Sequence, residues 1–327
     1  MKKILIIRFS SIGDIVLTTP VIRCLATQLP QVEIHYLTKK IYTPLLEANP
    51  YIHHLHLYDG NLRDIQKKLK QENFDVIIDL HKNLRTFLVK MALGKKSYSF
   101  NKINLQKWLM VNFKINILPD KHIVDRYMET VKPLQVTNDG KGLDYFIPQK
   151  DEINLESLPA THQPGYIAFV IGAKFNTKKL PVRKIIAICQ KIEKPIILLG
   201  GAEDRSEGHE VSLAAGELVY NACGKYSISQ SASLVRQAQA VISHDTGLMH
   251  IAAAFKKNIV SVWGNTIPEF GMSPYLPISD SAKSKIFEVQ KLPCRPCSKL
   301  GYSKCPQKHF LCMESHDEVE IKDFLYR

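Results

Sequence analysis

One segment of this 327-residue chain has the residue types of a proton acceptor beside a tight turn. Ser10-Ser11-Ile12-Gly13-Asp14 follows an apolar run, and Gly13 allows the backbone to approach a ligand closely. The Asp14 carboxylate could accept a proton from a substrate hydroxyl group. The same position suits an aspartate that caps a helix by binding its free N–H groups. Spacing alone leaves these two interpretations open.

A second segment, Ser243 to His250, has the pattern of an anion site at the start of a helix. Asp245 and Thr246 are residue types that commonly precede a helix. Backbone N–H groups at such a position bind phosphate well. Here these donors belong to Thr246, Gly247 and Leu248. His250 lies one turn further and could reach the same anion; a lone histidine is more often a core residue, but its neighbours favour a functional one.

Two further loops could lie beside the same anion. The loop from Gly172 to Pro181 contains Lys178, and a lysine that follows a strand can pair with a diphosphate. A solvated basic loop is the alternative. The pair Gly200-Gly201 also follows a strand and suits a tight turn near a ligand, although such pairs are common. The Gly-x4-Gly-Lys-Ser/Thr spacing of a P-loop is absent from the sequence.

Cysteines are concentrated towards the end of the chain. Cys294 and Cys297 have the Cys-x2-Cys spacing of half a structural zinc site, which Cys305 and Cys312, or His309, could complete. The later spacing is irregular, so reduced cysteines in a surface loop are the alternative. A closed site with four protein ligands would stabilise a loop and would not catalyse a reaction.

These segments follow short strands in a chain that alternates strand and helix, which predicts an α/β fold with parallel sheets. Strands are expected at 3–9, 32–37, 75–80, 166–171, 195–199, 240–243 and 258–262, and helices at 14–28, 62–71, 182–191, 231–238, 247–255 and 314–327. The proline-rich stretch 146–165 separates two domains, 1–150 and 151–313. We expect the terminal helix at 314–327 to pack back on the first domain, and ligands to bind at the carboxyl ends of the strands, in a cleft between the two sheets.

The charge of the chain favours an anionic partner. Lys and Arg number 44 against 31 Asp and Glu, and ten of the thirteen excess positive charges lie in residues 1–150. Lysines that merely keep the fold soluble are the alternative. A nucleic acid is not the expected partner, because RNA-binding and helix-turn-helix motifs are absent from the sequence. A dinucleotide oxidoreductase is disfavoured because no Gly-x-Gly-x-x-Gly follows Phe9.

The segment Ile103–Leu118 places Trp108 and Phe113 among lysines. An apolar face edged by lysines could rest on an anionic membrane surface, or it could belong to the core of a domain. No apolar run reaches the ~18 residues of a membrane-spanning helix, and the N-terminal run is too short for a signal peptide. The expected location is therefore the cytoplasm, with peripheral contact at the inner membrane left open.

In their order, these segments resemble glycosyltransferase family 9, the ADP-heptose–lipopolysaccharide heptosyltransferases. The resemblance lies in Lys3 to Asp14, Asp75 to Arg85, His122 to Tyr127, Gly172 to Pro181 and, most specifically, Asp245 to His250. It implies a GT-B fold, with two Rossmann-like domains facing each other across a cleft. It also implies an inverting transfer of a heptose or related sugar from an ADP-sugar to a lipopolysaccharide core or lipid A-type acceptor, with no essential metal or cofactor.

The resemblance implies a role for several residues. Asp14 would be the general base. With the glycine pair added from the pattern above, the donor-binding residues would be Lys178, Asp245, Thr246, Gly247, Leu248, His250, Gly200 and Gly201. The acceptor-binding residues would be Ser10, Ser11, Gly13, Lys82, Arg85 and Arg126. The expected partners are thus a nucleotide sugar and an anionic glycolipid.

Two departures from the family pattern leave alternatives open. The loop Lys178-Lys179-Leu180-Pro181 lacks the tryptophan that the family has before its proline, and His81 and Lys82 replace a Gln-Gly pair. One alternative is the same fold with a different nucleotide sugar and another surface glycan. The other is a nucleotide-binding protein without transfer activity.

Overall fold

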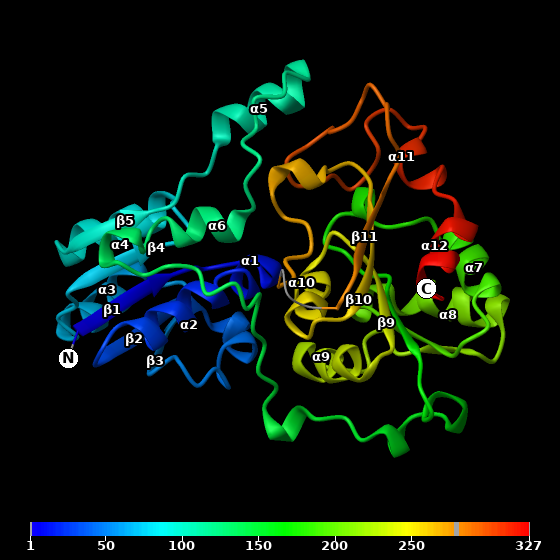
Figure 1. Ribbon diagram of the computed structural model, residues 1–327, viewed down its shortest axis with the longest axis horizontal. Helices are drawn as coiled ribbons and strands as arrows, with labels where there is room; N and C mark the ends of the chain where they lie inside the picture. Colours follow the sequence, from blue (N-terminus) through cyan, green and yellow to red (C-terminus); the bar gives the residue numbers. More distant parts are fainter. Residues whose placement is uncertain (1, 278–280, 327) are drawn as a thin grey trace. The chain divides into compact units, whose positions relative to one another are not determined.

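The computed structural model describes residues 2–277 and 281–326, and the chain forms two compact α/β units (Figure 1). The first unit comprises Met1–Lys102 and Lys121–Pro148, and the second comprises Ile103–Asp120 and Gln149–Arg327. The last break between the two units follows Pro148, and the excursion formed by residues 103–120 groups with the second unit. Within the described residues, no helix is both long enough and apolar enough to span a bilayer.

The excursion is held to the second unit by its lysines. The ammonium group of Lys114 donates to the carbonyl oxygen of Pro296 at 2.7 Å. The ammonium group of Lys107 lies 5.3 Å from the centre of the Phe270 ring. These contacts join residues far apart in the sequence, which explains why the composition of the segment did not reveal them.

The first unit is built on a parallel five-stranded sheet in the order β3-β2-β1-β4-β5. Its strands are β1 Lys2–Ile7, β2 Val32–Lys39, β3 His54–Tyr58, β4 Val76–Asp79 and β5 Lys96–Ser99. Four consecutive apolar residues, Ile4 to Ile7, are fully buried in β1, as expected of a central strand covered on both faces. The strand order reverses between β1 and β4, and ligands in such sheets bind at that point.

Helices flank this sheet, and several begin at side-chain caps. The α-helices are α1 Ile12–Val16, α2 Thr19–Gln28, α3 Leu62–Gln71, α4 Leu84–Leu93 and α6 Ile123–Met128, and the 3₁₀ turns are η1 Lys40–Leu45 and η2 Lys132–Leu134. Asn83 caps α4 by accepting from the Thr86 N–H, and the helix ends at Gly94, whose φ of +61° favours glycine. The helix expected at 14–28 is in fact two helices, α1 and α2.

The second unit is built on a parallel six-stranded sheet in the order β11-β10-β9-β6-β7-β8. Its strands are β6 Ile167–Val170, β7 Ile196–Leu199, β8 Val219–Asn221, β9 Ala240–His244, β10 Asn258–Trp263 and β11 Ser284–Glu288. The order reverses between β6 and β9, so the loops that follow these two strands lie side by side. The loop from Gly172 to Pro181, called the lysine loop below, follows β6, and the candidate anion site at Ser243 to His250 spans the end of β9 and the start of α10.

Its α-helices are α5 Asn104–Phe113, α7 Val182–Lys191, α8 Arg205–Ala215, α9 Ile228–Gln237, α10 Gly247–Ala254, α11 Leu311–Glu314 and α12 Glu318–Leu325. The 3₁₀ turns are η3 Gln149–Asp151, η4 Leu155–Ser157, η5 Ala160–His162, η6 Asn176–Lys178, η7 Ala202–Asp204 and η8 Pro268–Phe270. The core of the unit contains Phe169 of β6 and Ile185 and Ile188 of α7. This burial follows the apolar periodicity of the sequence.

The terminal helix α12 packs on α7 of the second unit, which corrects the expectation that it packs on the first. Ile321 is fully buried in the core of the second unit, and Phe324 packs against it. Lys184 of α7 forms an ion pair of 2.5 Å with Glu318. The apolar face of α12 is therefore satisfied by the domain that immediately precedes it.

Candidate active site

The turn between β9 and α10 has the form of an anion site. Asp245 to Leu248 are partly exposed where the turn meets the start of the helix. Thr246 is the residue before the helix, with extended backbone (φ −139°, ψ 175°) and no side-chain hydrogen bond to the first turn. N–H groups in the first turn have no partner within a helix. Since the Thr246 side chain does not satisfy them, they can donate to an anionic ligand.

The structure brings Lys178 to this turn. Its Nζ lies 2.5 Å from Asp245 Oδ2 and 3.3 Å from the Asp245 carbonyl oxygen. The hydroxyl of Thr266, which follows β10, donates to the same Oδ2 at 2.9 Å. Three neighbouring strands thus each contribute one polar side chain at the carboxyl edge of the sheet. The result is a cation held beside the free N–H groups of a helix.

Sequence reasoning did not assign a role to Thr266. The available signal was its position: it comes a few residues after the predicted strand 258–262, just as Asp245 follows the strand 240–243. Parallel strands place their carboxyl ends at one edge, so polar residues after adjacent strands meet there. The order of the strands, which decides which loops are adjacent, is the missing information.

The rest of the lysine loop is anchored inside the second unit. Lys179 is buried and forms ion pairs with Asp204 at 2.8 Å and Glu207 at 2.5 Å. The Leu180 N–H donates to Nε2 of the buried His244 at 3.0 Å. Complete burial lowers the pKa of His244 to about 3, with Lys179 adding to the effect, so this imidazole stays neutral and can accept that bond. Lys178 is therefore carried by a loop with fixed attachments.

The glycine pair has a different explanation from the one expected. A Cβ atom on Gly200 would lie 2.8 Å from both the Cβ and Oδ2 atoms of Asp204. The Gly201 N–H donates to the same carboxylate oxygen at 2.9 Å. Gly200 therefore leaves room for the buried Asp204 side chain, whereas a Cβ atom on Gly201 would lie 2.3 Å from Oε2 of Glu203. Donor contact is not needed to explain a glycine at position 200.

His250 also differs from the expectation. It is 1% exposed and lies on the buried face of α10 between Met249 and Ile251, which are fully buried. A ligand at the start of the helix would meet the partly exposed Asp245 to Leu248 segment before it met this imidazole. A role for His250 in the core, which is the alternative given in the sequence analysis, fits this position better than contact with an anion.

In the first unit, Asp14 lies at the reversal point between β1 and β4 and is held in place by two neighbours. Arg8 Nη2 lies 2.6 Å from its Oδ1. The N–H and the hydroxyl of Ser11 donate to its Oδ2 at 3.2 and 2.7 Å. Ser11 is the cap residue of α1, so Asp14 does take part in capping this helix. The carboxylate has about four lone-pair positions, and these three bonds leave one on Oδ1 for a hydroxyl group.

The electrostatics of Asp14 keep it ionised. Burial alone would raise the pKa of Asp14, but the Arg8 charge and the Ser11 hydrogen bonds outweigh burial and hold the pKa below its usual value. Arg8 is itself fixed by hydrogen bonds to the Leu80 carbonyl at 2.5 Å and the Tyr127 hydroxyl at 3.0 Å. Sequence reasoning missed Arg8; the signal was a charge that directly follows the four apolar residues Ile4 to Ile7 of the strand expected at 3–9.

The six predicted acceptor contacts differ in exposure. Ser10 and Ser11 lie partly or fully at the surface, whereas Gly13 is buried inside α1. Arg85 stacks over the rings of Phe9, at 5.3 Å, and Tyr58, at 4.9 Å. Lys82 is exposed beside it.

Arg126, which is predicted to bind the acceptor, is only 2% exposed. It lies in α6 next to Tyr127, and burial lowers its pKa. An acceptor could reach this guanidinium only if the surrounding residues moved. The motif that contains it contributes Tyr127 to the Arg8 network instead.

The cysteine segment does not form a zinc-like cluster of ligand atoms. Cys294 Sγ lies 3.8 Å from His309 Nε2, and the Cys297 thiol donates to the Cys294 carbonyl at 3.0 Å. Across residues 2–277 and 281–326, no group of three candidate ligand atoms within 4.8 Å of one another includes Cys294, Cys297, Cys305 or Cys312. The four thiols are free, and zinc at this segment stays a prediction.

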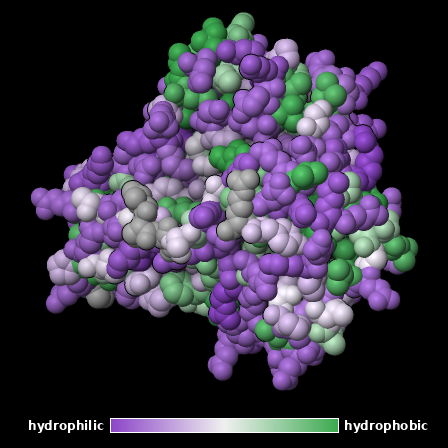
Figure 2. Space-filling view, turned by 45° about the vertical axis from the view of Figure 1, so that its right-hand side comes forward, coloured by the Kyte–Doolittle hydropathy of each residue, from purple (hydrophilic) through white to green (hydrophobic). Residues whose placement is uncertain are grey.

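Two helices carry apolar side chains that are not part of a core. On α5 no residue is buried, and Leu105 is 64%, Trp108 47% and Phe113 58% exposed. Hydrophobic side chains gather at the top of Figure 2, where Figure 1 places α5. On α4 an exposed stripe repeats at helical spacing and consists of Leu84, Phe87, Leu88 and Met91. The core interpretation of the segment 103–118 is therefore wrong for α5.

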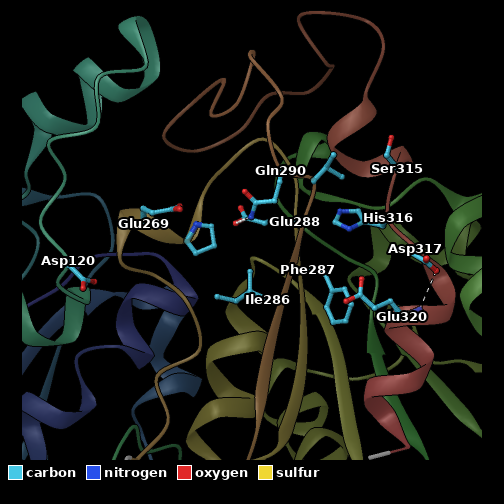
Figure 3. Close-up of a pocket in the computed structure, with 12 residues that line it drawn as sticks. Asp120, Glu269, Ile286, Phe287, Glu288, Gln290, Ser315, His316, Asp317 and Glu320 are labelled. Atoms are coloured by element: carbon cyan, nitrogen blue, oxygen red, sulfur yellow. Dashed lines mark hydrogen bonds between the residues drawn. The ribbon is translucent and has the colours of Figure 1, made fainter.

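A pocket of about 760 Å³ lies elsewhere in the second unit, between β11, the turn at Glu269 and the helices α11 and α12 (Figure 3). Its lining includes five carboxylates, from Asp120, Glu269, Glu288, Asp317 and Glu320. None of the residues predicted to bind the donor lines it. A wall of negative charge would repel a diphosphate, so this pocket is not the expected donor site.

Comparison with known proteins identifies the family of the chain. A sequence model of glycosyltransferase family 9 (heptosyltransferase) matches residues 62–303. Lipopolysaccharide heptosyltransferase 2 of Escherichia coli strain K12 is 24% identical over 303 residues, covering 82% of this chain and 84% of that protein. Lipooligosaccharide heptosyltransferase 2 of Haemophilus influenzae is 25% identical over 340 residues, covering 91% and 92%.

Solved structures show the same fold. The structure of the ADP-heptose lipopolysaccharide heptosyltransferase II of Escherichia coli has a TM-score of 0.73 and 21% identity, covering 100% of this chain and 99% of that one. A family 9 glycosyltransferase from Veillonella parvula has a TM-score of 0.78 and 20% identity, covering 99% and 97%. This likeness confirms the expected GT-B fold class, with two α/β units that each contain a parallel sheet.

Proposed function

Because the chain belongs to glycosyltransferase family 9, we propose that it transfers a heptose from ADP-heptose to the core region of a lipopolysaccharide acceptor. Membership of this family identifies the chain as a glycosyltransferase. The observation that supports the proposed donor is the placement of Lys178 at the exposed start of α10, beside Asp245 and Thr266.

The second unit would bind the donor diphosphate. When the bond between the anomeric carbon and the diphosphate breaks, negative charge develops on the leaving ADP. Lys178 and the N–H groups of Gly247 and Leu248 would stabilise that charge, because they are already aimed at one place and need little rearrangement. In this proposal these groups supply the charge stabilisation, and no metal ion or other cofactor takes part.

The first unit would supply the base. The acceptor hydroxyl oxygen attacks the anomeric carbon on the face opposite the leaving diphosphate, so the configuration inverts. The hydroxyl proton passes to the free position on Oδ1 of Asp14 as the new carbon–oxygen bond forms. Arg8 makes Asp14 a weaker base, but it also fixes the carboxylate and keeps it ionised.

The acceptor would be an anionic glycolipid bound by the first unit. Residues 1–150 carry the excess of positive charge, and Lys82 and Arg85 lie close to the reversal point of the sheet. The exposed stripe of α4 begins at Leu84, which lies between these two residues in the sequence, and could contact the lipid part of the acceptor. Lysines next to exposed apolar side chains on α5 fit a peripheral contact with the inner face of the cytoplasmic membrane.

A thermal-shift experiment on the purified protein tests the donor. A ligand that binds the folded state raises the midpoint of unfolding. We expect ADP and ADP-heptose to stabilise the protein, and UDP-sugars, GDP-sugars and NAD to have no effect. Stabilisation by another nucleotide sugar alone would replace the donor, and no shift with any nucleotide would contradict the proposed donor site.

A further inference from the structure

A cluster of histidine and glutamate side chains lies in the first unit, away from Asp14. Glu33 and His35 lie on β2, and His54 and His56 lie on the edge strand β3. Alternate residues of a strand point to one face of its sheet, and His35 pairs with His54 in the register of the two strands. The cluster lies towards the amino-terminal ends of the strands, whereas Asp14 follows the carboxyl end of β1.

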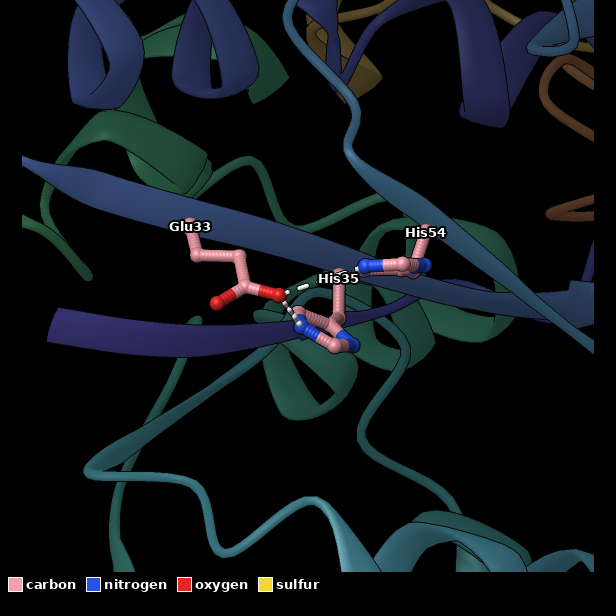
Figure 4. Close-up of side chains that lie close together, drawn as sticks. All are labelled: Glu33, His35 and His54. Carbon is pink, nitrogen blue, oxygen red and sulfur yellow. Dashed lines mark hydrogen bonds and ion pairs between the residues drawn. The ribbon is translucent and has the colours of Figure 1, made fainter. Parts of the chain in front are cut away.

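Three potential ligand atoms of this cluster converge (Figure 4). Nε2 of His35 lies 3.0 Å from Oε1 of Glu33, and Nε2 of His54 lies 3.2 Å from the same oxygen. Two ligands on one tetrahedral zinc ion, with bonds of about 2.0–2.2 Å, lie about 3.3–3.6 Å apart. The two separations from Glu33 Oε1 are thus within a few tenths of an ångström of this range, and all three ligand atoms lie within 4.8 Å of one another.

We propose that Glu33, His35 and His54 bind a divalent transition-metal cation of the zinc class, with water completing its coordination. Imidazole nitrogen and carboxylate oxygen are ligands that such ions take. The His54 side chain is 57% exposed and opens the site to solvent, whereas Glu33, 9% exposed, and the fully buried His35 hold fixed positions. The bound ion joins the edge strand β3 to β2 and stabilises the first unit.

His56 acts as an outer partner of this site. Its Nε2 lies 2.8 Å from His35 Nδ1, which is too short for two ligands of one ion and fits a hydrogen bond. When the lone pair of His35 Nε2 binds the metal, the Nδ1–H group of the same ring donates to His56. Metal-bound histidines commonly donate their second N–H in this way, and this bond fixes the tautomer and the ring orientation.

The surrounding groups are compatible with a bound cation. Lys3 Nζ lies 3.7 Å from Oε2 of Glu33, the oxygen that faces away from the imidazoles, and 3.2 Å from Glu72. The ring of Phe74 packs edge-on against His35, with 5.0 Å between ring centres.

Zinc binding to chelator-treated protein tests the proposal. To exclude the cysteine segment, all measurements use a background with Cys294→Ser and Cys297→Ser. Equilibrium dialysis should then find one Zn²⁺ per chain, and Zn²⁺ should raise the midpoint of thermal unfolding. Co²⁺ in the same site should show the visible absorption of nitrogen and oxygen ligation without a thiolate charge-transfer band.

Single substitutions in the same background identify which residues bind the zinc ion. His54→Ala alters an exposed side chain on an edge strand, and Glu33→Gln keeps the shape of the side chain, so both should fold. Each should weaken zinc binding by more than ~100-fold, whereas His56→Ala should weaken it by roughly 10- to 100-fold. His209→Ala, which removes an exposed histidine of α8, is the matched control and should bind like the parent. Absence of zinc binding in the Cys294→Ser, Cys297→Ser background, or unchanged binding when His54→Ala or Glu33→Gln is added to it, would overturn the proposal.

Discussion

Nζ of Lys178 lies 2.5 Å from Oδ2 of Asp245, although 67 residues separate the two in the sequence. The contact exists because β6 and β9 are neighbours in the sheet, so the loops that follow them meet. Thr266 donates to the same carboxylate oxygen and fixes its orientation. In the proposed function, this arrangement holds a cation at the diphosphate position before the donor arrives.

Replacing Lys178 should reduce transfer. Lys178→Ala removes one preorganised group that stabilises the leaving diphosphate, and loss of one such group typically lowers kcat by about 10²–10³. The side chains of the ion pair with Asp245 are only 16% and 10% exposed, and its loss leaves that carboxylate with the Thr266 hydroxyl, so the midpoint of thermal unfolding should also fall. Steady-state kinetics and a melting curve measure both effects. Lys174→Ala, on the same loop but stacked over Phe175, is the control and should retain activity.

Replacing Asp14 should separate catalysis from donor binding. Asp14→Asn removes the proton acceptor, and we expect at least about a 100-fold loss of transfer with unchanged affinity for ADP. It also leaves the buried Arg8 without its partner, which should lower the free energy of unfolding by about 3 kcal/mol. Asp64→Asn, at a first-turn aspartate of α3, should leave transfer unchanged. Turnover of Asp14→Asn at the parent rate would exclude Asp14 as the base.

The second unit should lose stability in acid through His244. An unfolded histidine has a pKa of about 6.5, whereas burial lowers the pKa of folded His244 to about 3. Between these values only the unfolded chain binds the proton, so the free energy of unfolding falls as the pH falls, by up to about 1.4 kcal/mol per pH unit. The free energy of unfolding, measured by urea titration at several pH values from 7 to 5, should fall less steeply with falling pH for His244→Asn than for the parent. Equal slopes would show that His244 does not carry this dependence.

The terminal helix should be required for the stability of the second unit. Ile321→Ala creates a cavity at a fully buried position and should cost about 2–5 kcal/mol of unfolding free energy. Val319→Ala, on the same helix at a position that is 48% exposed, should change it by less than about 0.5 kcal/mol. Chemical denaturation of the two variants measures the difference. Similar losses for both would contradict the packing of α12 on α7.

The sequence predicts the strands that are buried on both faces, because their apolar runs are continuous. β1, β4, β6, β7, β9 and β10 all lie within or next to the predicted ranges. Edge and near-edge strands such as β3 and β11 escape prediction, since their sequences are interrupted by polar residues. In β3 the interruption comes from His54 and His56, whose rings both pack against the ring of His35 on β2, a relation that only strand pairing reveals.

In the candidate site, too, the sequence predicts local features and misses those that depend on the pairing of strands. Residues that begin a helix after a strand, such as Asp245 and Thr246, are visible in the sequence because their residue types and positions are local properties. Other residues have surroundings that only the three-dimensional structure shows. Gly200 is explained by Asp204, and Arg126 by burial beside Tyr127. Arg8 and Thr266 were missed because their partners lie on other strands.

The most direct test of the proposed function is a transfer assay with two products. The purified protein is mixed with ADP-heptose and a lipopolysaccharide acceptor that lacks heptose, and the acceptor mass and the released ADP are measured together. We predict that the acceptor gains one heptose for each ADP released, and that Lys178→Ala and Asp14→Asn strongly reduce both signals. Transfer from a different nucleotide sugar, with ADP-heptose left unused, would contradict the proposed donor. Unchanged product formation in both variants would contradict the proposed site.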